Sequence, residues 1–256
     1  MIEVKHGDFT KMAKNYINRV GYSEVVLKNL ASYVGIDEES TIADVGAGTG
    51  KLTENLLLLG NQKIYAVEPN DQMREEGSKY IEDKRVEWLK GNGEDTKLKD
   101  ASIDWLFMGS SFHWVDTEKG LKEFSRVLTP GGFFTAIWNP RDIKGNPLHE
   151  RIEDKIYEIV PNIKRVSSGS GKFTDFLFEK LVSTGDFKDV IYVEAHHNEV
   201  MSKERYLGIW KSVNDIRVQA GEDKWFLILE SIADMIKDQD EIIVPYKTRS
   251  WTVRKK

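Results

Sequence analysis

Strand-like and helix-like segments alternate between residues 41 and 138, and this alternation restricts the fold more than any other feature. Continuous apolar runs, typical of strands buried on both faces, recur at 41–45, 63–68, 85–89, 103–108 and 133–138. Helical patterns separate most of them, at 51–59, 71–82 and 117–128. Such a repeat predicts an α/β fold with a doubly wound, mostly parallel, Rossmann-like sheet that binds ligands at the carboxyl ends of its strands.

The pattern changes after Trp138. Residues 140–180 contain three prolines and the stretch SSGSG at 167–171, which predicts an insertion rather than sheet. Strand patterns return at 189–195 and 241–253, with helical stretches near 202–212 and 223–237 between them. We therefore expect a core over 1–139, a helical cap or lid over 140–180, and the remainder of the sheet with two inserted helices over 181–256.

Composition excludes several classes of protein. The chain has 37 basic and 42 acidic residues, a formal charge of -5, which disfavours a nucleic-acid partner. It has no cysteine, so disulfides, thiolate nucleophiles and cysteine-bound zinc are excluded, and no grouping of histidines and carboxylates has metal-ligand spacing. The amino-terminal segment has no continuous apolar run of the kind a signal peptide needs, so we expect a cytoplasmic protein without membrane association.

Three glycines, Gly46, Gly48 and Gly50, lie within five positions of the stretch TIADVGAGTGKL at 41–52. Glycine permits a positive φ and lets a ligand approach the backbone. The loop follows a strand and opens a helix, so its amides could hold a polar or anionic group. Glu68 ends the next strand, where a carboxylate can accept hydrogen bonds from ribose hydroxyls. Together these features favour a nucleoside-containing cofactor over a simple tight turn.

The glycine spacing discriminates between cofactors. A dinucleotide fingerprint would place its third glycine at position 51, which is Lys51 here. An NAD-dependent oxidoreductase is therefore the less favoured alternative.

Several motifs resemble those of one family: IADVGAGTGKLT, YAVEPNDQM, GNGED, SIDWLFMGSSFHWVD and EFSRVLTPGGFFTAIWNPRD. They are similar to the successive motifs of class I S-adenosylmethionine-dependent methyltransferases, in particular the small-molecule, type 11 subgroup that includes trans-aconitate methyltransferase-like proteins. The resemblance covers residues 16–141, and it implies S-adenosyl-L-methionine as cofactor and a small-molecule methyl acceptor, with a carboxylate as one candidate. The predicted fold includes an antiparallel last strand. A non-catalytic S-adenosylmethionine-binding protein remains an alternative, and nothing in the sequence predicts the oligomeric state.

The resemblance also implies roles for individual residues. Asp44, Gly46, Ala47 and Gly48 would surround the methionine portion of the cofactor, and Glu68 would bind the ribose. Met73 would contact the adenine, although a core-filling role is equally open. The remaining cofactor-binding positions are Pro69, Asn92, Gly93, Glu94 and Ser110.

The segment NYINRVGYS resembles a family segment in which Tyr16, Arg19 and Tyr22 would close over the cofactor carboxylate. A capped, solvated helix entry is the alternative interpretation.

His113 follows the fourth strand-like run, where the transferable methyl group would point, and it is the candidate catalytic residue. It could line the acceptor pocket or act as a general base. His196 and His197 are interpreted as structural.

We further expect residues 140–180 to act as a lid hinged near 167–171, with Arg141 as a partner for an acidic group. An excursion packed on one side of the sheet is the alternative.

Overall fold

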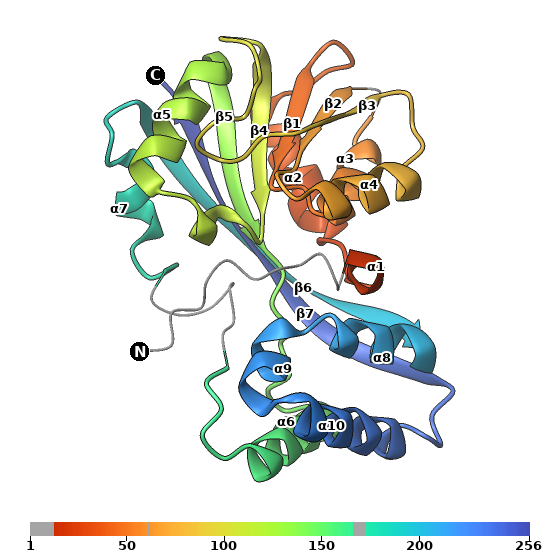
Figure 1. The fold of residues 1–256 in the computed structure, drawn as a ribbon. Coiled ribbons are helices and arrows are strands. Elements are labelled where there is room, and N and C mark those ends of the chain that lie inside the picture. Colours follow the sequence, from red (N-terminus) through yellow and green to blue (C-terminus); the bar gives the residue numbers. More distant parts are fainter. Residues whose placement is uncertain (1–12, 61, 166–172) are drawn as a thin grey trace.

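The computed structural model describes residues 13–60, 62–165 and 173–256. It consists of a seven-stranded sheet with helices on both faces and, beyond the carboxyl ends of the parallel strands, a separate layer of helices (Figure 1). The two parts are joined by a long β-hairpin that runs through both.

The sheet has the strand order β3-β2-β1-β4-β5-β7-β6. Its five parallel strands are β1 (Thr41–Val45), β2 (Lys63–Val67), β3 (Val86–Leu89), β4 (Ile103–Gly109) and β5 (Leu128–Trp138). β7 (Glu241–Lys255) is antiparallel to both of its neighbours, β5 and β6 (Phe187–Ser202). This arrangement confirms the predicted Rossmann-like fold with an antiparallel last strand, and it places the change in strand order beside β1 and β4.

Helices bury both faces of the sheet, which explains the continuous apolar runs in the strands. On one face, Leu27 and Leu30 of α2 (Glu24–Val34) and Leu56 of α3 (Lys51–Leu57) share a core with Ile42 and Trp105. On the other face, α5 (Thr117–Val127) and α7 (Leu177–Val182) cover β4 and β5 through buried apolar side chains, namely Leu121, Phe124, Leu177, Leu181, Leu106 and Phe134. Each such side chain contributes about 1.5–3 kcal/mol when fully buried.

α4 (Asp71–Tyr80) packs beside β3, where the side chain of Trp88 fills the space next to Gly77. A Cβ at Gly77 would lie 2.4 Å from the Trp88 ring, so this close approach requires glycine.

The second layer rests on the outer half of the β6–β7 hairpin. β7 pairs with β5 only over residues 249–254, whereas its pairing with β6 continues to Glu241. The layer contains α6 (Pro147–Ile159), α8 (Lys203–Lys211), α9 (Asn214–Ala220) and α10 (Glu222–Met235), and its core includes Ile152, Ile156, Ile209, Trp210, Ile228 and Val244.

The cap is thus formed by other segments of the chain than the predicted insertion over 140–180 alone. α6 comes from that range, but it shares its core with helices that follow residue 203, while Leu177 of α7 packs in the core of the sheet. The apolar stripe of α6, with Ile152 and Ile156, must be buried against some partner, and its own sequence does not specify which distant segment supplies it. The hinge expected at 167–171 lies outside the described residues.

Candidate active site

A cleft lies between the carboxyl ends of the strands and the helical layer. It has a volume of about 2770 Å³ and is lined by the loops after β1, β2, β4 and β5 and by residues of α6 and α9. Pockets for single small molecules measure about 300–1,000 Å³, so this cleft has room for a cofactor and an acceptor together.

The three glycines after β1 have different reasons to be glycine, although all have positive φ, at 73°, 59° and 87°. A Cβ at Gly46 would lie 2.7 Å from Ser111 Oγ, and one at Gly50 would lie 2.5 Å from Ile81 Cδ1. Gly48 is different, because the nearest atom to its Cβ position is Met73 Cε at 3.4 Å. Packing therefore requires two of the glycines, whereas Gly48 leaves backbone open to the cleft.

The amides of this loop are largely engaged by the protein itself. Gly46 N and Ala47 N donate to Val67 O at 2.8 and 3.1 Å, and Gly48 N donates to Glu68 Oε2 at 2.8 Å. In this structure the three amides fasten the loop to the end of β2. That they hold a ligand group stays a prediction.

Asp44 is fully buried near the end of β1. Its Oδ2 accepts a hydrogen bond of 2.7 Å from Thr53 Oγ1, while its Oδ1 has no partner in the described part of the chain. Burial raises the pKa of this carboxyl group to about 7. A buried acceptor atom without a partner is costly, and here it borders the cleft. Asp44 therefore fits a ligand that brings its own donor.

Glu68 follows β2 and is 7% exposed. Its Oε2 accepts from Gly48 N, and its Oε1 accepts from Asn70 N at 2.9 Å. Burial raises the pKa of this group as well. Each carboxylate oxygen has a second lone pair, so Glu68 can still accept hydrogen bonds from hydroxyl groups of a ligand. Pro69 and Met73 line the same part of the cleft.

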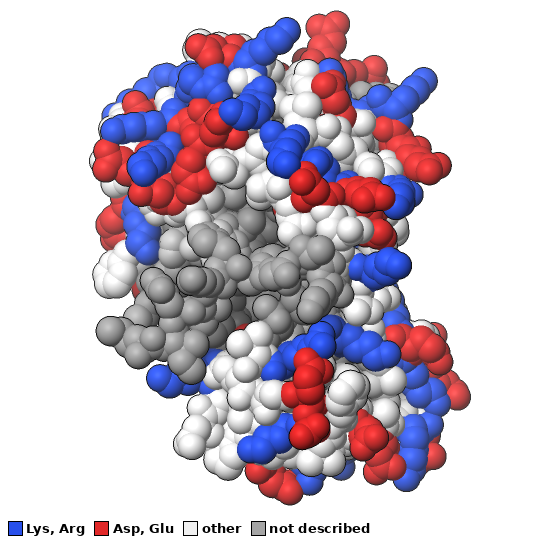
Figure 2. All heavy atoms as spheres, in the orientation of Figure 1, with Lys and Arg blue, Asp and Glu red and all other residues white. Residues whose placement is uncertain are grey.

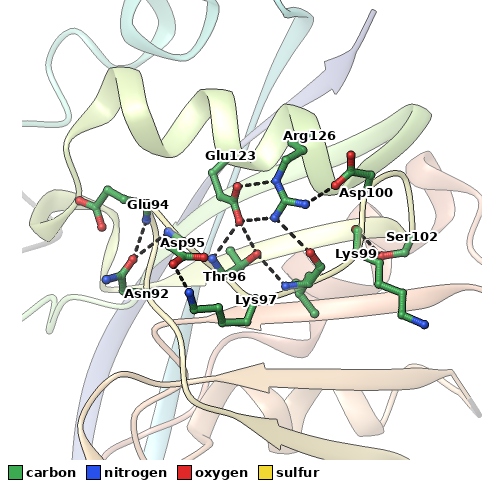
Figure 3. A network of polar contacts seen from close by, with 11 residues as sticks. Asn92, Glu94, Asp95, Thr96, Lys97, Lys99, Asp100, Ser102, Glu123 and Arg126 are labelled. Atoms are coloured by element: carbon green, nitrogen blue, oxygen red, sulfur yellow. Dashed lines mark hydrogen bonds and ion pairs between the residues drawn. The ribbon is translucent and has the colours of Figure 1, made fainter.

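The GNGED turn is held by hydrogen bonds between its own residues (Figure 3). Asn92 Oδ1 accepts from Glu94 N and Asp95 N at 3.0 and 2.8 Å, and a Cβ at Gly93 would lie 2.4 Å from Val115 Cγ2. Glu94 Oε1 accepts from Asp116 N at 2.9 Å. Asn92, Gly93 and Glu94 all line the cleft.

The loop that follows this turn is anchored to α5. Thr96 donates to Glu123 Oε1 through both N and Oγ1, at 2.8 and 2.6 Å, and Arg126 Nη2 donates to Leu98 O at 3.0 Å (Figure 3). Arg126 also pairs with Glu123 and Asp100. These contacts with α5 hold the turn in place.

Residues of the amino-terminal segment line the cleft. Tyr16, Arg19, Tyr22 and Ser110 all line the cleft, as the resemblance implies. Arg19, however, donates from Nε and Nη2 to Oγ and O of Ser212 at 2.6 and 2.9 Å, so it links this segment to the end of α8. The Tyr22 hydroxyl is hydrogen-bonded to Ser110 Oγ at 3.1 Å.

His113 lies in the 3-10 turn Phe112–Trp114 after β4, among the rings of Trp114, Trp138 and Phe173 at centroid distances of 4.6, 6.5 and 6.2 Å. Its Nδ1 is buried without a partner among the described residues, and burial lowers its pKa to about 4. The imidazole is therefore neutral at pH 7 and can accept a hydrogen bond.

Three residues that support the site were not singled out in the sequence. Thr53 holds Asp44, and Ser111 packs against Gly46 while donating to Val45 O at 3.1 Å. Asn139 donates from Nδ2 to Gly21 O at 2.6 Å and accepts from Thr248 at 2.8 Å. The only sequence signal for Thr53 is a polar residue on the apolar stripe of the helix 51–59.

Over the described residues, no three or more histidine, aspartate or glutamate side chains form a group that could hold a metal ion, and no helix is long and apolar enough to cross a bilayer. On the face shown in Figure 2, basic and acidic side chains are interspersed. The basic stripe typical of nucleic-acid binders is not seen among the residues described there.

The strand order is that of a Rossmann-like methyltransferase fold, and an acidic residue lies at each of two adjacent strand ends beside the glycine loop. Residues 43–136 of the chain match the model of a family described as methyltransferase domain, of type 11.

Curated relatives match part of the chain. An uncharacterized methyltransferase of Schizosaccharomyces pombe is 34% identical over 133 residues, covering 52% of this chain and 52% of its own. Sterol 24-C-methyltransferase of Aspergillus fumigatus is 30% identical over 162 residues, covering 59% of this chain and 43% of its own. The chain thus matches about half of the length of these relatives or less.

A solved structure of a type II methyltransferase candidate from Anaeromyxobacter dehalogenans has a TM-score of 0.64 at 18% identity and covers 92% of this chain and 97% of its own. At that identity the likeness concerns the fold alone.

Proposed function

We propose that the protein is an enzyme that methylates a small molecule held in the cleft, with S-adenosylmethionine as the methyl donor. The observation that carries this proposal is Asp44, which lines the cleft near the open backbone of Gly48 and whose buried Oδ1 has no partner among the described residues. A cofactor that donates a hydrogen bond to this oxygen would relieve the cost of leaving it unpaired.

The residues of the chain fit such a cofactor. Asp44 and Glu68 provide carboxylate acceptors, Gly48 permits close approach, and Met73 provides an apolar surface that is 5% exposed. Asn92, Gly93 and Glu94 would border the base, and Tyr16, Arg19 and Ser110 would border the opposite end. S-adenosylmethionine supplies an already activated methyl group, so the protein has to align the acceptor and exclude water, and such positioning can lower a barrier by about 7–11 kcal/mol.

His113 is proposed to contact the acceptor. Its neutral imidazole can take the proton of a hydroxyl or amine, although a base with a pKa of about 4 is weak at neutral pH. An acceptor carboxylate needs no general base. The lowered pKa of His113 therefore agrees better with a carboxylate acceptor than with a hydroxyl or an amine.

Two measurements test the proposal. Calorimetry should detect binding of S-adenosylmethionine and S-adenosylhomocysteine and none of NAD. Incubation with methyl-labelled S-adenosylmethionine and a panel of small acids, phenols and amines should then transfer label to at least one of them. Cofactor binding without any transfer over a broad panel would favour the non-catalytic alternative, and absence of cofactor binding would contradict both.

A further inference from the structure

Arg141 is a shielded cation with unused hydrogen-bonding capacity. It lies just beyond β5, opposite Tyr246 in a β-bridge, and its guanidinium carbon is 4.3 Å from the centre of the Trp210 ring. Its side chain is 19% exposed. Within the described residues, its guanidinium makes one polar contact, from Nη2 to Glu153 Oε1 at 3.4 Å. A guanidinium has five donors, so most of those of Arg141 remain available to a ligand in the cleft that it lines.

Other arginines that line the cleft are paired more closely. Arg19 makes two short hydrogen bonds to Ser212, and Arg217 contacts Glu222 from Nε and Nη2 at 2.9 and 2.8 Å. Arg165 holds Glu153 through Nη1 at short range and lies 3.4 Å from Asp215. Glu153 is therefore shared by two arginines, and Arg165 has the stronger contact.

The surroundings of Arg141 combine a polar end with an apolar wall. The phenol of Tyr246 lies in the electrostatic field of both Arg141 and Arg19, which partly offsets the rise in its pKa caused by burial. The helical side of the cleft is lined both by apolar side chains, among them Ile143, Tyr157, Val160, Ile209 and Val213, and by charged side chains that pair with one another, such as Arg217 with Glu222. A ligand with an apolar body and one charged end can pack on the apolar side chains without separating those pairs.

We infer that the acceptor is an amphipathic acid, with an anionic group bound by Arg141 and an apolar body packed along the helical layer. This inference rests on the proposed function, because it concerns the acceptor of the same cleft. On binding, the acid replaces the long contact between Arg141 and Glu153, while Glu153 keeps its contact with Arg165. Trp210 holds the guanidinium plane in place for a two-pronged contact with the acid group.

A matched pair of ligands, one acid and one amide, tests whether Arg141 binds the anionic group. With S-adenosylhomocysteine present in saturating amount, calorimetry compares 4-phenylbutanoate with 4-phenylbutanamide, which differ in charge but hardly in shape. We expect the acid to bind about tenfold more tightly or better, the usual effect of a hydrogen bond to a charged partner. Arg141→Gln should remove this preference and leave the affinity for the amide unchanged. Arg141→Lys should retain only part of the preference, because lysine lacks the planar fork.

Glu153→Gln provides a second test that leaves Arg141 in place. It removes the competing carboxylate, so the acid should bind more tightly than to the parent protein. Equal binding of acid and amide to the parent, no measurable binding of the acid, or an acid preference that survives Arg141→Gln in a folded variant would each overturn the inference. Affinity for S-adenosylhomocysteine, measured on the same samples, separates the two proposals, since its absence in the parent would contradict the proposed function itself.

Discussion

The two walls of the cleft are built in different ways. On the sheet side, Asp44, Glu68 and His113 lie at or just after the ends of β1, β2 and β4, so neighbouring strands bring them together. On the helical side, Arg141 meets Trp210 and Tyr246, residues about 70 and 100 positions away in the chain, through helix packing and the β6–β7 hairpin. The first wall follows from strand order, and the second follows from packing between distant segments.

The polar groups of the two walls also differ. The sheet wall contains two buried atoms without partners in the described chain, Asp44 Oδ1 and His113 Nδ1, and both groups have pKa values shifted by burial. The helical wall also has buried atoms without a hydrogen-bond partner among the described residues, Arg165 Nε and Trp210 Nε1, but its charged groups pair with one another, as Glu153 does with Arg141 and Arg165. The sheet wall is thus prepared for specific hydrogen bonds, whereas a ligand at the helical wall has to exchange with an existing ion pair.

The largest expected effect comes from the core of the helical layer. Ile228 of α10 is 1% exposed, and replacing such a residue with alanine costs about 2–5 kcal/mol. Ile228→Ala should increase hydrogen exchange in α6 and α10 far more than in β1 and β4, because the two walls have separate cores. Leu227→Ala is the control, since Leu227 is 50% exposed. An equal increase throughout the sheet would show that the walls unfold as one unit and would remove this contrast.

On the sheet wall, Glu68→Gln should weaken binding of S-adenosylhomocysteine. The amide replaces one carboxylate oxygen with a donor that faces a backbone N–H, and each lost hydrogen bond to a charged group costs about 1.5–3 kcal/mol. Calorimetry of a folded variant provides the measurement. Glu75→Gln on the exposed surface of α4 should leave the affinity unchanged. Affinity within twofold of the parent for Glu68→Gln would assign the ribose to another residue.

Gly48→Ala separates backbone conformation from ligand approach. A side chain in the left-handed region costs about 1–2 kcal/mol, and the nearest atom at 3.4 Å allows the methyl group to fit. The variant should fold, with slightly reduced stability and clearly weaker cofactor binding. Gly145→Ala is a matched control, because Gly145 has φ 82° and no atom within 4 Å of its Cβ position. Similar cofactor affinity in both variants would mean that Gly48 serves the turn alone.

The smallest expected effect is a dependence of cofactor affinity on pH. The pKa of Asp44, raised by burial to about 7, means that the folded protein without ligand holds a proton that the unfolded chain has lost above about pH 4. Folding stability should therefore fall as pH rises from about 4 to 7. A ligand that donates to the carboxylate favours its charged form, so affinity should rise about fivefold between pH 6 and pH 7 and level off above pH 7.

Calorimetry in buffers of different ionisation enthalpy checks this behaviour. Binding of S-adenosylhomocysteine near pH 6 should release a proton in the parent protein and none from this site in Asp44→Asn. If the variant releases the same number of protons as the parent, another group is responsible for the pH dependence.

The sequence by itself determined the sheet and the residues at its edge. Five apolar runs with helices between them allow few arrangements other than a parallel sheet, and the carboxyl end of each strand follows directly from where its run stops. The positions of Asp44, Glu68 and His113 at one edge could be predicted for that reason. Their environments could not, because a partner such as Thr53 and the burial that shifts a pKa depend on how a helix is rotated against the sheet.

Only the tertiary structure decided how the helical wall is composed. Nothing local in residues 147–159 indicates that α6 packs on helices that begin at residue 203, or that α7 leaves the cap for the core of the sheet. The glycine loop is a similar case. Its sequence suggested that all three glycines allow a ligand to approach, whereas Gly46 and Gly50 are required because Ser111 and Ile81 pack against them. One apolar stripe can pack against another almost equally well, so the shape and connectivity of the whole chain decide which helices meet. The same packing decides where Arg141 lies in the cleft.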